Sequence, residues 1–228
     1  MTTVPQIQIK KSSGRFFNIV DFPALPAHTP FGNLHLKYSL IAERLDYVNS
    51  LIQDTFEAYE KTMRQHSHAL AGVCDHRLLA EQIIYWLRKT ADELIALVWV
   101  LSERESKGTY PTRVNPDSIG RVINAKDIPP AIKPHLDFLG LLNEISNAYK
   151  HSFINSDISL IGEYEPVVNA LALKQNDLAN PADFHSVSLR EIIDRFDEFF
   201  LSADARLREC KLPHLTPGPG GPLASGGH

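Results

Sequence analysis

Residues 77–106 read RLLAEQIIYWLRKTADELIALVWVLSERES, and this stretch decides the fold. Its apolar residues recur at steps of three and four, which predicts an α-helix over the whole stretch. The apolar face is broad, so we expect this helix to be the most buried element of the protein. The residues that form this face are Leu79, Ile83, Trp86, Leu87, Leu94, Leu97, Val98 and Leu101.

Three further main helices are predicted around this one. Residues 34–65 repeat apolar side chains at the same spacing, and Gly72 breaks the pattern before the next helix. A third helix is expected from Pro129–Pro130 to about residues 153–155, because proline is tolerated in a first helical turn. The last helix begins at Ser188-Leu189-Arg190-Glu191, which has the form of a capping box.

Residues 158–173 have a different character. Two runs, 158–164 and 167–173, are rich in residues that favour strands and flank Glu165-Pro166, which predicts a β-hairpin. The fold class is therefore mainly α. We predict a four-helix up-and-down bundle with a small β-hairpin between the third and fourth main helices.

Proline and glycine divide the chain into three parts. Residues 1–32 are predicted to form an extended N-terminal arm with a short strand near residues 15–20. Residues 33–211 contain the helical bundle. Residues 212–228 are rich in proline and glycine and have almost nothing to bury, so we expect a disordered tail.

Composition restricts the classes of function. The net charge is −4, so the chain lacks the basic excess that stable wrapping of DNA or RNA requires. A local basic patch could still make weak contact with nucleic acid. The most apolar run, residues 94–101, is far shorter than the ~20 residues that span a bilayer. With only two cysteines and no signal peptide at the start, we predict a cytoplasmic protein that does not enter the membrane.

The third helix carries one chemically suggestive cluster. Asn143, Asn147 and His151 are successive i, i+4 neighbours and share one helix face, with Lys150 beside them. The apolar stripe of the helix points the other way, so we expect the cluster to face solvent, a partner subunit or a substrate.

The stretch Ser146-Asn147-Ala148-Tyr149-Lys150-His151 resembles the signature of the HEPN superfamily, helical-bundle proteins common in toxin–antitoxin and phage-defence systems. The family motif has an arginine, often followed by a polar residue such as asparagine, and a histidine a few positions later. Asn147 and His151 match the polar residue and the histidine, whereas Ser146 stands where the family has arginine. The order of helices over residues 34–210 is also similar.

The resemblance implies metal-independent RNA cleavage by a homodimer in bacterial stress or phage defence, with a cognate antitoxin or another protein as a further partner. His151 would help the ribose 2′-hydroxyl to attack the adjacent phosphate, and Asn147 would orient it or hold the phosphate. Lys150, or Arg88 from residues 77–106, would supply the missing positive charge, and Asn143 would contact the substrate. Because lysine lacks the bidentate fork of arginine, we expect weak or degenerate activity.

Other interpretations of the same residues stay open. Lysine and histidine in a last helical turn also interact favourably with the helix dipole, which needs no substrate. The bundle would then be a non-catalytic interaction module for a protein partner or a nucleotide. A further alternative is a zinc site formed by His66, His68, Cys74 and His76, although their spacing does not match the common zinc modules. No phosphate-binding glycine loop or dinucleotide fingerprint is present, so no cofactor is expected.

Overall fold

The computed structural model describes residues 3–13, 18–64, 70–151, 165–173, 177 and 179–210. The chain is mainly helical, as predicted. Its elements in order are β1 (Lys11–Ser13), β2 (Asn18–Val20), α1 (Leu34–Arg64), α2 (Leu70–Lys107), α3 (Ile119–Val122), the 3₁₀ turn η1 (Lys133–His135), α4 (Leu136–His151), β3 (Val167–Leu173), β4 (Ala182–Ser188) and α5 (Leu189–Glu209). None of the described helices contains an apolar run that could span a bilayer.

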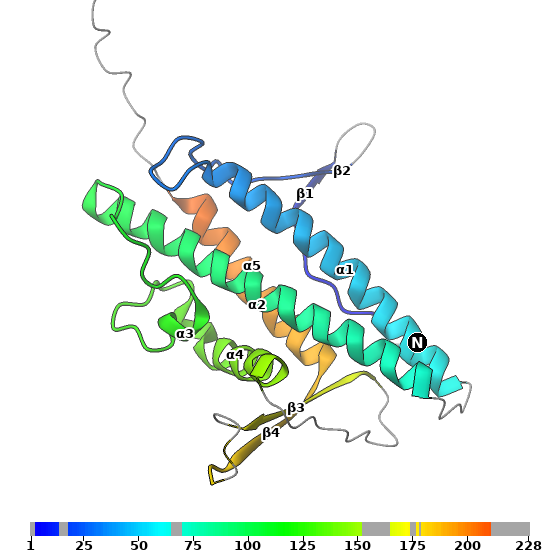
Figure 1. Ribbon diagram of the computed structural model, residues 1–228. Coiled ribbons are helices and arrows are strands. Elements are labelled where there is room, and N and C mark those ends of the chain that lie inside the picture. The colour runs from blue at the N-terminus through cyan, green and yellow to red at the C-terminus, as the bar shows by residue number, and fades with distance from the viewer. Residues whose placement is uncertain are drawn as a thin grey trace, which may run out of the picture.

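Helix α2 is the centre of the core. It packs against α1, α3, α4 and α5, and six of the eight residues predicted for its apolar face are buried; Leu79 and Trp86 are partly exposed. In Figure 1, α1 and α2 lie side by side in opposite directions, and α5 runs behind them in the direction of α2. The broad apolar face of α2 is therefore explained by its several helical neighbours.

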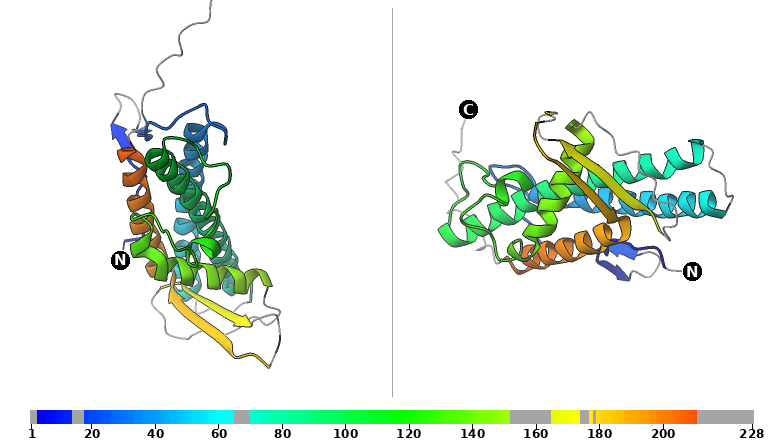
Figure 2. Two further views of the ribbon diagram at one scale, coloured as in Figure 1. Left: turned by 90° about the vertical axis from the view of Figure 1, so that its left-hand side faces the viewer. Right: turned by 90° about the horizontal axis from the view of Figure 1, so that it is seen from below.

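Helix α4 lies across the three long helices instead of alongside them (Figure 2). Together with the parallel course of α2 and α5, this means that the predicted up-and-down order of the four helices is not confirmed. The long connection between α2 and α4 leaves the direction of α4 unrestricted, because only short loops force neighbouring helices to be antiparallel.

Two predicted helix boundaries were wrong. Gly72 lies inside α2, which begins at Leu70; one glycine costs a helix only about 1 kcal/mol. The prolines at 129 and 130 precede α4 by a turn and η1, so α4 begins at Leu136. Pro134, inside η1, withholds a further backbone N–H, which favours a short 3₁₀ turn before the α-helix starts.

The β-hairpin is present between α4 and α5, but its pairing differs from the prediction. The run 167–173 is strand β3, and it pairs antiparallel with β4, from Val167 opposite Ser188 to Leu173 opposite Ala182. The other predicted strand, 158–164, lies outside the described residues. Strand β4 has little apolar alternation and faces solvent along most of its length, so its sequence carried no strand signal.

The N-terminus of α5 forms where predicted. The Ser188 Oγ accepts the Glu191 backbone N–H at 3.4 Å and donates to the Glu165 carboxylate at 2.6 Å. The Glu191 carboxylate pairs with Arg195 at 3.3 Å. The serine half of the capping box is therefore confirmed, and it also ties the start of β3 to the start of α5.

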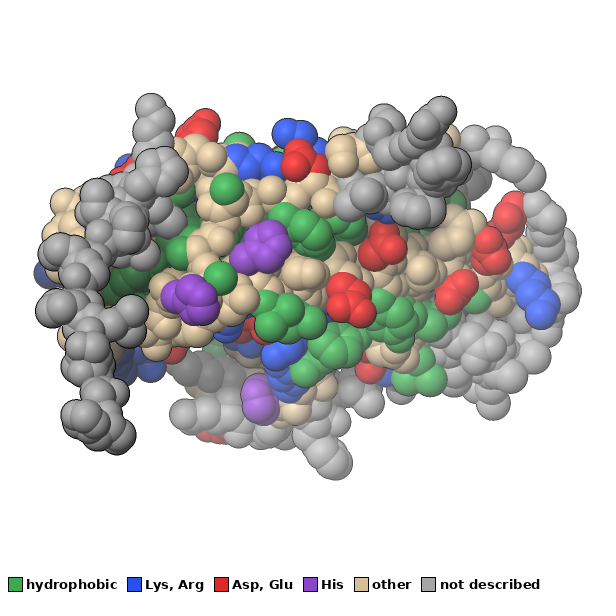
Figure 3. Space-filling view, turned by 90° about the horizontal axis from the view of Figure 1, so that it is seen from above, with side chains coloured by type: hydrophobic (Ala, Val, Ile, Leu, Met, Phe, Trp, Pro, Cys, Tyr) green, Lys and Arg blue, Asp and Glu red, His purple; other side chains and the backbone are tan. Residues whose placement is uncertain are grey.

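The surface over α1 carries a row of hydrophobic side chains next to acidic ones (Figure 3). Leu36, Leu40 and Tyr47 are about half exposed, at 54%, 51% and 50%. Their spacing places them on one side of the helix, opposite the side that packs on α2. This row, Leu36–Leu40–Tyr47, is called the α1 stripe below.

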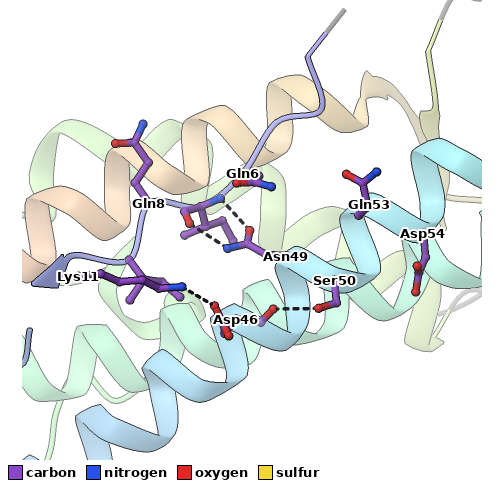
Figure 4. Close-up of a pocket in the computed structure, with 10 residues that line it drawn as sticks. Gln6, Gln8, Lys11, Asp46, Asn49, Ser50, Gln53 and Asp54 are labelled. Carbon is purple, nitrogen blue, oxygen red and sulfur yellow. Dashed lines mark hydrogen bonds and ion pairs between the residues drawn. The ribbon is translucent and has the colours of Figure 1, made fainter. Parts of the chain in front are cut away.

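The N-terminal arm packs on its own chain. Ile7 and Leu25 belong to the main core, and β1 pairs with β2 within the arm. The Asn49 side chain accepts the Ile7 N–H at 2.8 Å and donates to the Ile7 carbonyl at 2.9 Å. Figure 4 shows these bonds at the edge of an open polar groove between the arm and α1. The predicted tail, 212–228, and residues 15–17 of the predicted arm strand lie outside the described residues, whereas residues 18–20 form β2.

Replacing Asn49 with alanine is expected to loosen the arm and to lower the free energy of unfolding by about 1–3 kcal/mol, because two partly buried backbone groups of Ile7 lose their partners. Urea unfolding measures the loss, and limited proteolysis reports arm release. Ser50→Ala is the matched control, since the Ser50 hydroxyl is exposed and bonds only weakly within its own helix. Equal protease resistance of Asn49→Ala and wild type would contradict the role of Asn49.

Candidate functional site

The cluster predicted on the third helix lies at the C-terminal end of α4 and faces outward. Asn147, Lys150 and His151 are exposed and Asn143 is partly buried. At about 100° per residue, Asn143, Asn147 and Lys150 lie on one side of the helix, with His151 at its margin. The buried residues Leu142, Ile145 and Ala148 hold the opposite side against the core.

Ser146 points into the protein, with only 2% of its surface exposed. It lies about 140° around the helix from His151. A side chain at the position of the family arginine therefore does not share the surface of His151 in this chain. Any cation that works with His151 must come from Lys150 or from another helix.

Arg88 of α2 reaches this face of α4. Its Nη2 donates to the Asn143 Oδ1 at 3.0 Å, and its Nη1 forms an ion pair with the Asp92 Oδ2 at 3.3 Å. The Arg88 Nε is buried and has no hydrogen-bond partner among the described residues. Arg88 is thus held in one orientation by two helices, and part of its hydrogen-bonding capacity is unused.

Asp92, one turn further along α2, helps to fix the position of Arg88. Its Oδ1 accepts the Ile119 backbone N–H at 2.7 Å, which links α2 to the start of α3. Burial raises the pKa of the Asp92 carboxyl above its ordinary value, and the Ile119 N–H and the Arg88 charge oppose that rise. Asp92 thus contacts both Arg88 and the start of α3.

Lys150 completes the cluster from the α4 side. Its Nζ lies 5.4 Å from the centre of the Tyr85 ring, a cation–π contact with α2. Burial and the nearby Arg88 charge lower the pKa of the Lys150 ammonium, and Asp92 opposes this. Lys150 and Arg88 therefore lie close enough for their charges to interact, and together they offer positive charge from two helices.

The site therefore brings the cations Arg88 and Lys150 from two helices close to the Asp92 carboxylate. An exposed imidazole and an exposed amide lie on the same end of α4. Such a set can hold a phosphate group and move a proton next to it. Tyr85 and Asp92 were not predicted as site residues from the sequence. Tyr85, Arg88 and Asp92 are spaced i, i+3, i+7, so they share one face of α2 and this spacing was the available signal.

The alternative zinc cluster falls largely outside the described part of the chain. His66 and His68 are not described, nor is the side chain of Cys74. His76 packs edge-on against the Tyr59 ring, with 5.4 Å between ring centres. Among the residues that are described, no group of three or more His, Cys, Asp or Glu side chains is placed to hold a metal ion.

A separate groove lies between the C-terminal half of α2 and α3, with Trp99 in its wall. Two cations that line it form ion pairs with carboxylates. Lys107 pairs with Glu103 at 2.5 Å, and Arg121 pairs with Asp117 at 3.2 Å. The charges in this groove therefore largely cancel. The face with Arg88 and Lys150 is the stronger candidate for anion binding.

No family model matches the chain, and no curated protein or solved structure does so either.

Proposed function

We propose that this chain is a HEPN-like, weak metal-independent endoribonuclease that acts in the cytoplasm. Arg88 and Lys150 bind a phosphate of the RNA, and His151 handles the proton. Asn147 and Asn143 position the phosphate and the imidazole. The observation that carries the proposal is the 3.0 Å contact between Arg88 and Asn143, which brings a cation from α2 to the helix face that bears His151.

The step requires only groups that the chain supplies. His151 removes the proton of a ribose 2′-hydroxyl, the O2′–P bond forms, and the P–O5′ bond breaks. The products are a 2′,3′-cyclic phosphate and a 5′-hydroxyl, and the leaving oxygen takes a proton from imidazolium or water. Arg88 and Lys150 stabilise the charge that builds on the phosphate oxygens.

Two features make the predicted activity weak. Lys150 is a point charge without the bidentate geometry of arginine. The arginine that does reach the site is partly neutralised by Asp92 at 3.3 Å. A homodimer that joins two such faces would double the local positive charge, so we propose a second copy of the chain as one partner. A cognate antitoxin in bacterial stress or phage defence is the other proposed partner, and it rests on the resemblance to the HEPN superfamily.

The test is cleavage of total bacterial RNA in EDTA by wild type and Arg88→Ala. We expect Arg88→Ala to cut RNA at least about 100-fold more slowly, because a preorganised cation is lost from the transition state. Arg190→Ala is the matched control. Arg190 is also a largely buried arginine paired to a carboxylate, Glu165 at 2.7 Å, but it lies at the start of α5 and none of its described contacts is with a residue of the proposed site.

Stability is measured alongside by thermal unfolding, because both substitutions leave a carboxylate without its arginine. Slower cleavage only in Arg88→Ala would assign the arginine to the site. Equal losses in both variants would mean that stability, and not the site, limits activity.

The second candidate function, a non-catalytic interaction module, is favoured by the α1 stripe. Leu36, Leu40 and Tyr47 form an exposed apolar row on a chain of net charge −4. Clusters of exposed apolar side chains often mark protein interfaces. No RNA cleavage by wild type, combined with a partner whose binding is lost in Leu40→Glu, would favour this function.

A further inference from the structure

Tyr85 is an exposed aromatic side chain at the centre of the cationic site. It is 45% exposed, although it lies on α2, the central helix of the core. The Trp86 ring packs edge-on against it with 4.9 Å between ring centres, which steadies the tyrosine. The ring is thus held in place while part of its surface stays accessible.

The surroundings of Tyr85 combine an aromatic ring with two cations. The Lys150 Nζ lies 5.4 Å from the ring centre, and Arg88 follows one helical turn later, with its Nε buried and unbonded among the described residues. Nucleic acid offers the complementary pair of groups, a flat base and an adjacent phosphate. An unmodified amino acid or a simple sugar does not offer both groups.

We infer that Tyr85 is a stacking platform for an unpaired base, and that the site takes single-stranded RNA with the adjacent phosphate on Lys150 and Arg88. This inference rests on the proposed function and specifies its substrate class. Every base has a π-face, so stacking tolerates different sequences.

The placement of the ring explains the preference for a single strand. In a duplex, each base is covered on both faces by its neighbours and its edge is paired. A base can stack on the Tyr85 ring only if one of its own faces is uncovered. Unpaired loops and ends supply such bases at little cost, whereas a duplex must first be opened.

The experiment is fluorescence anisotropy with a labelled 2′-O-methyl RNA of mixed sequence, which binds but cannot be cleaved at its blocked 2′ positions. The strand is used alone and in duplex with its complement. Variants are Tyr85→Ala, Tyr85→Phe and, as the matched control, Tyr47→Ala. Tyr47 is similarly exposed, at 50%, but it lies on the α1 stripe.

We expect single-strand affinity to fall by on the order of tenfold in Tyr85→Ala, to be retained in Tyr85→Phe, and to be unchanged in Tyr47→Ala. The duplex is expected to bind more weakly than the strand. Single-strand binding that is equal in Tyr85→Ala and wild type would overturn the inference. If wild type then still cleaves RNA, the proposed function stands without Tyr85; if wild type neither binds nor cleaves, both fail.

Discussion

Replacing His151 with alanine is expected to slow RNA cleavage by about 10²–10⁴-fold, because the variant loses the imidazole that takes the 2′-hydroxyl proton in the proposed step. His151 is exposed at the last position of α4, so the substitution removes no core packing. The free energy of unfolding should change by no more than about 1 kcal/mol, the size of an interaction with the end of the helix dipole. Single-turnover cleavage of total bacterial RNA in EDTA measures the rate, and urea unfolding checks the fold.

The control for this substitution is His28→Ala. His28 is also exposed, but it lies in the arm before α1, away from α4. Cleavage should be lost in His151→Ala and retained in His28→Ala. If His151→Ala cleaves RNA as fast as wild type, any nuclease activity in the preparation comes from elsewhere and the assignment of His151 is wrong.

Asp204→Ala is expected to lower the free energy of unfolding by about 3–5 kcal/mol, the largest stability effect that we predict. Asp204 is buried on α5, with 6% of its surface exposed. It accepts the Tyr38 hydroxyl and, at 2.6 Å, the Arg208 Nε. Arg208 also reaches the Asp21 carboxylate at 3.1 Å. Removing Asp204 leaves the buried Tyr38 hydroxyl without this acceptor. The largely buried Arg208 guanidinium then keeps only Asp21 as a carboxylate partner.

Two further variants separate the parts of this effect in urea unfolding. Tyr38→Phe removes only the hydroxyl and leaves the Asp204–Arg208 pair, so we expect a loss of only about 1 kcal/mol. Asp194→Ala removes an exposed acidic side chain from the same helix and should be nearly neutral. A loss below about 1 kcal/mol in Asp204→Ala would show that the network of Tyr38, Asp204 and Arg208 does not stabilise the fold.

The sequence predicted the candidate site in part. The face of Asn143, Asn147 and His151 followed from helical spacing alone, and the structure places Asn147 and His151 on the surface. Arg88 was predicted only as an alternative source of charge. Its 3.0 Å contact with Asn143 joins residues 55 positions apart, and no local pattern encodes how two helices cross.

The main helices, the serine cap of α5 and the buried face of α2 could be predicted from the residues alone. These features depend on side-chain spacing and on bonds within a few residues, such as the Glu191 N–H to Ser188. The crossing of α4, the pairing of β3 with β4 and the inward direction of Ser146 became evident only in the folded chain. Strand β4 forms because β3 offers it a hydrogen-bonding edge, and Ser146 is buried because α4 packs across the other helices. Both depend on contacts between distant segments.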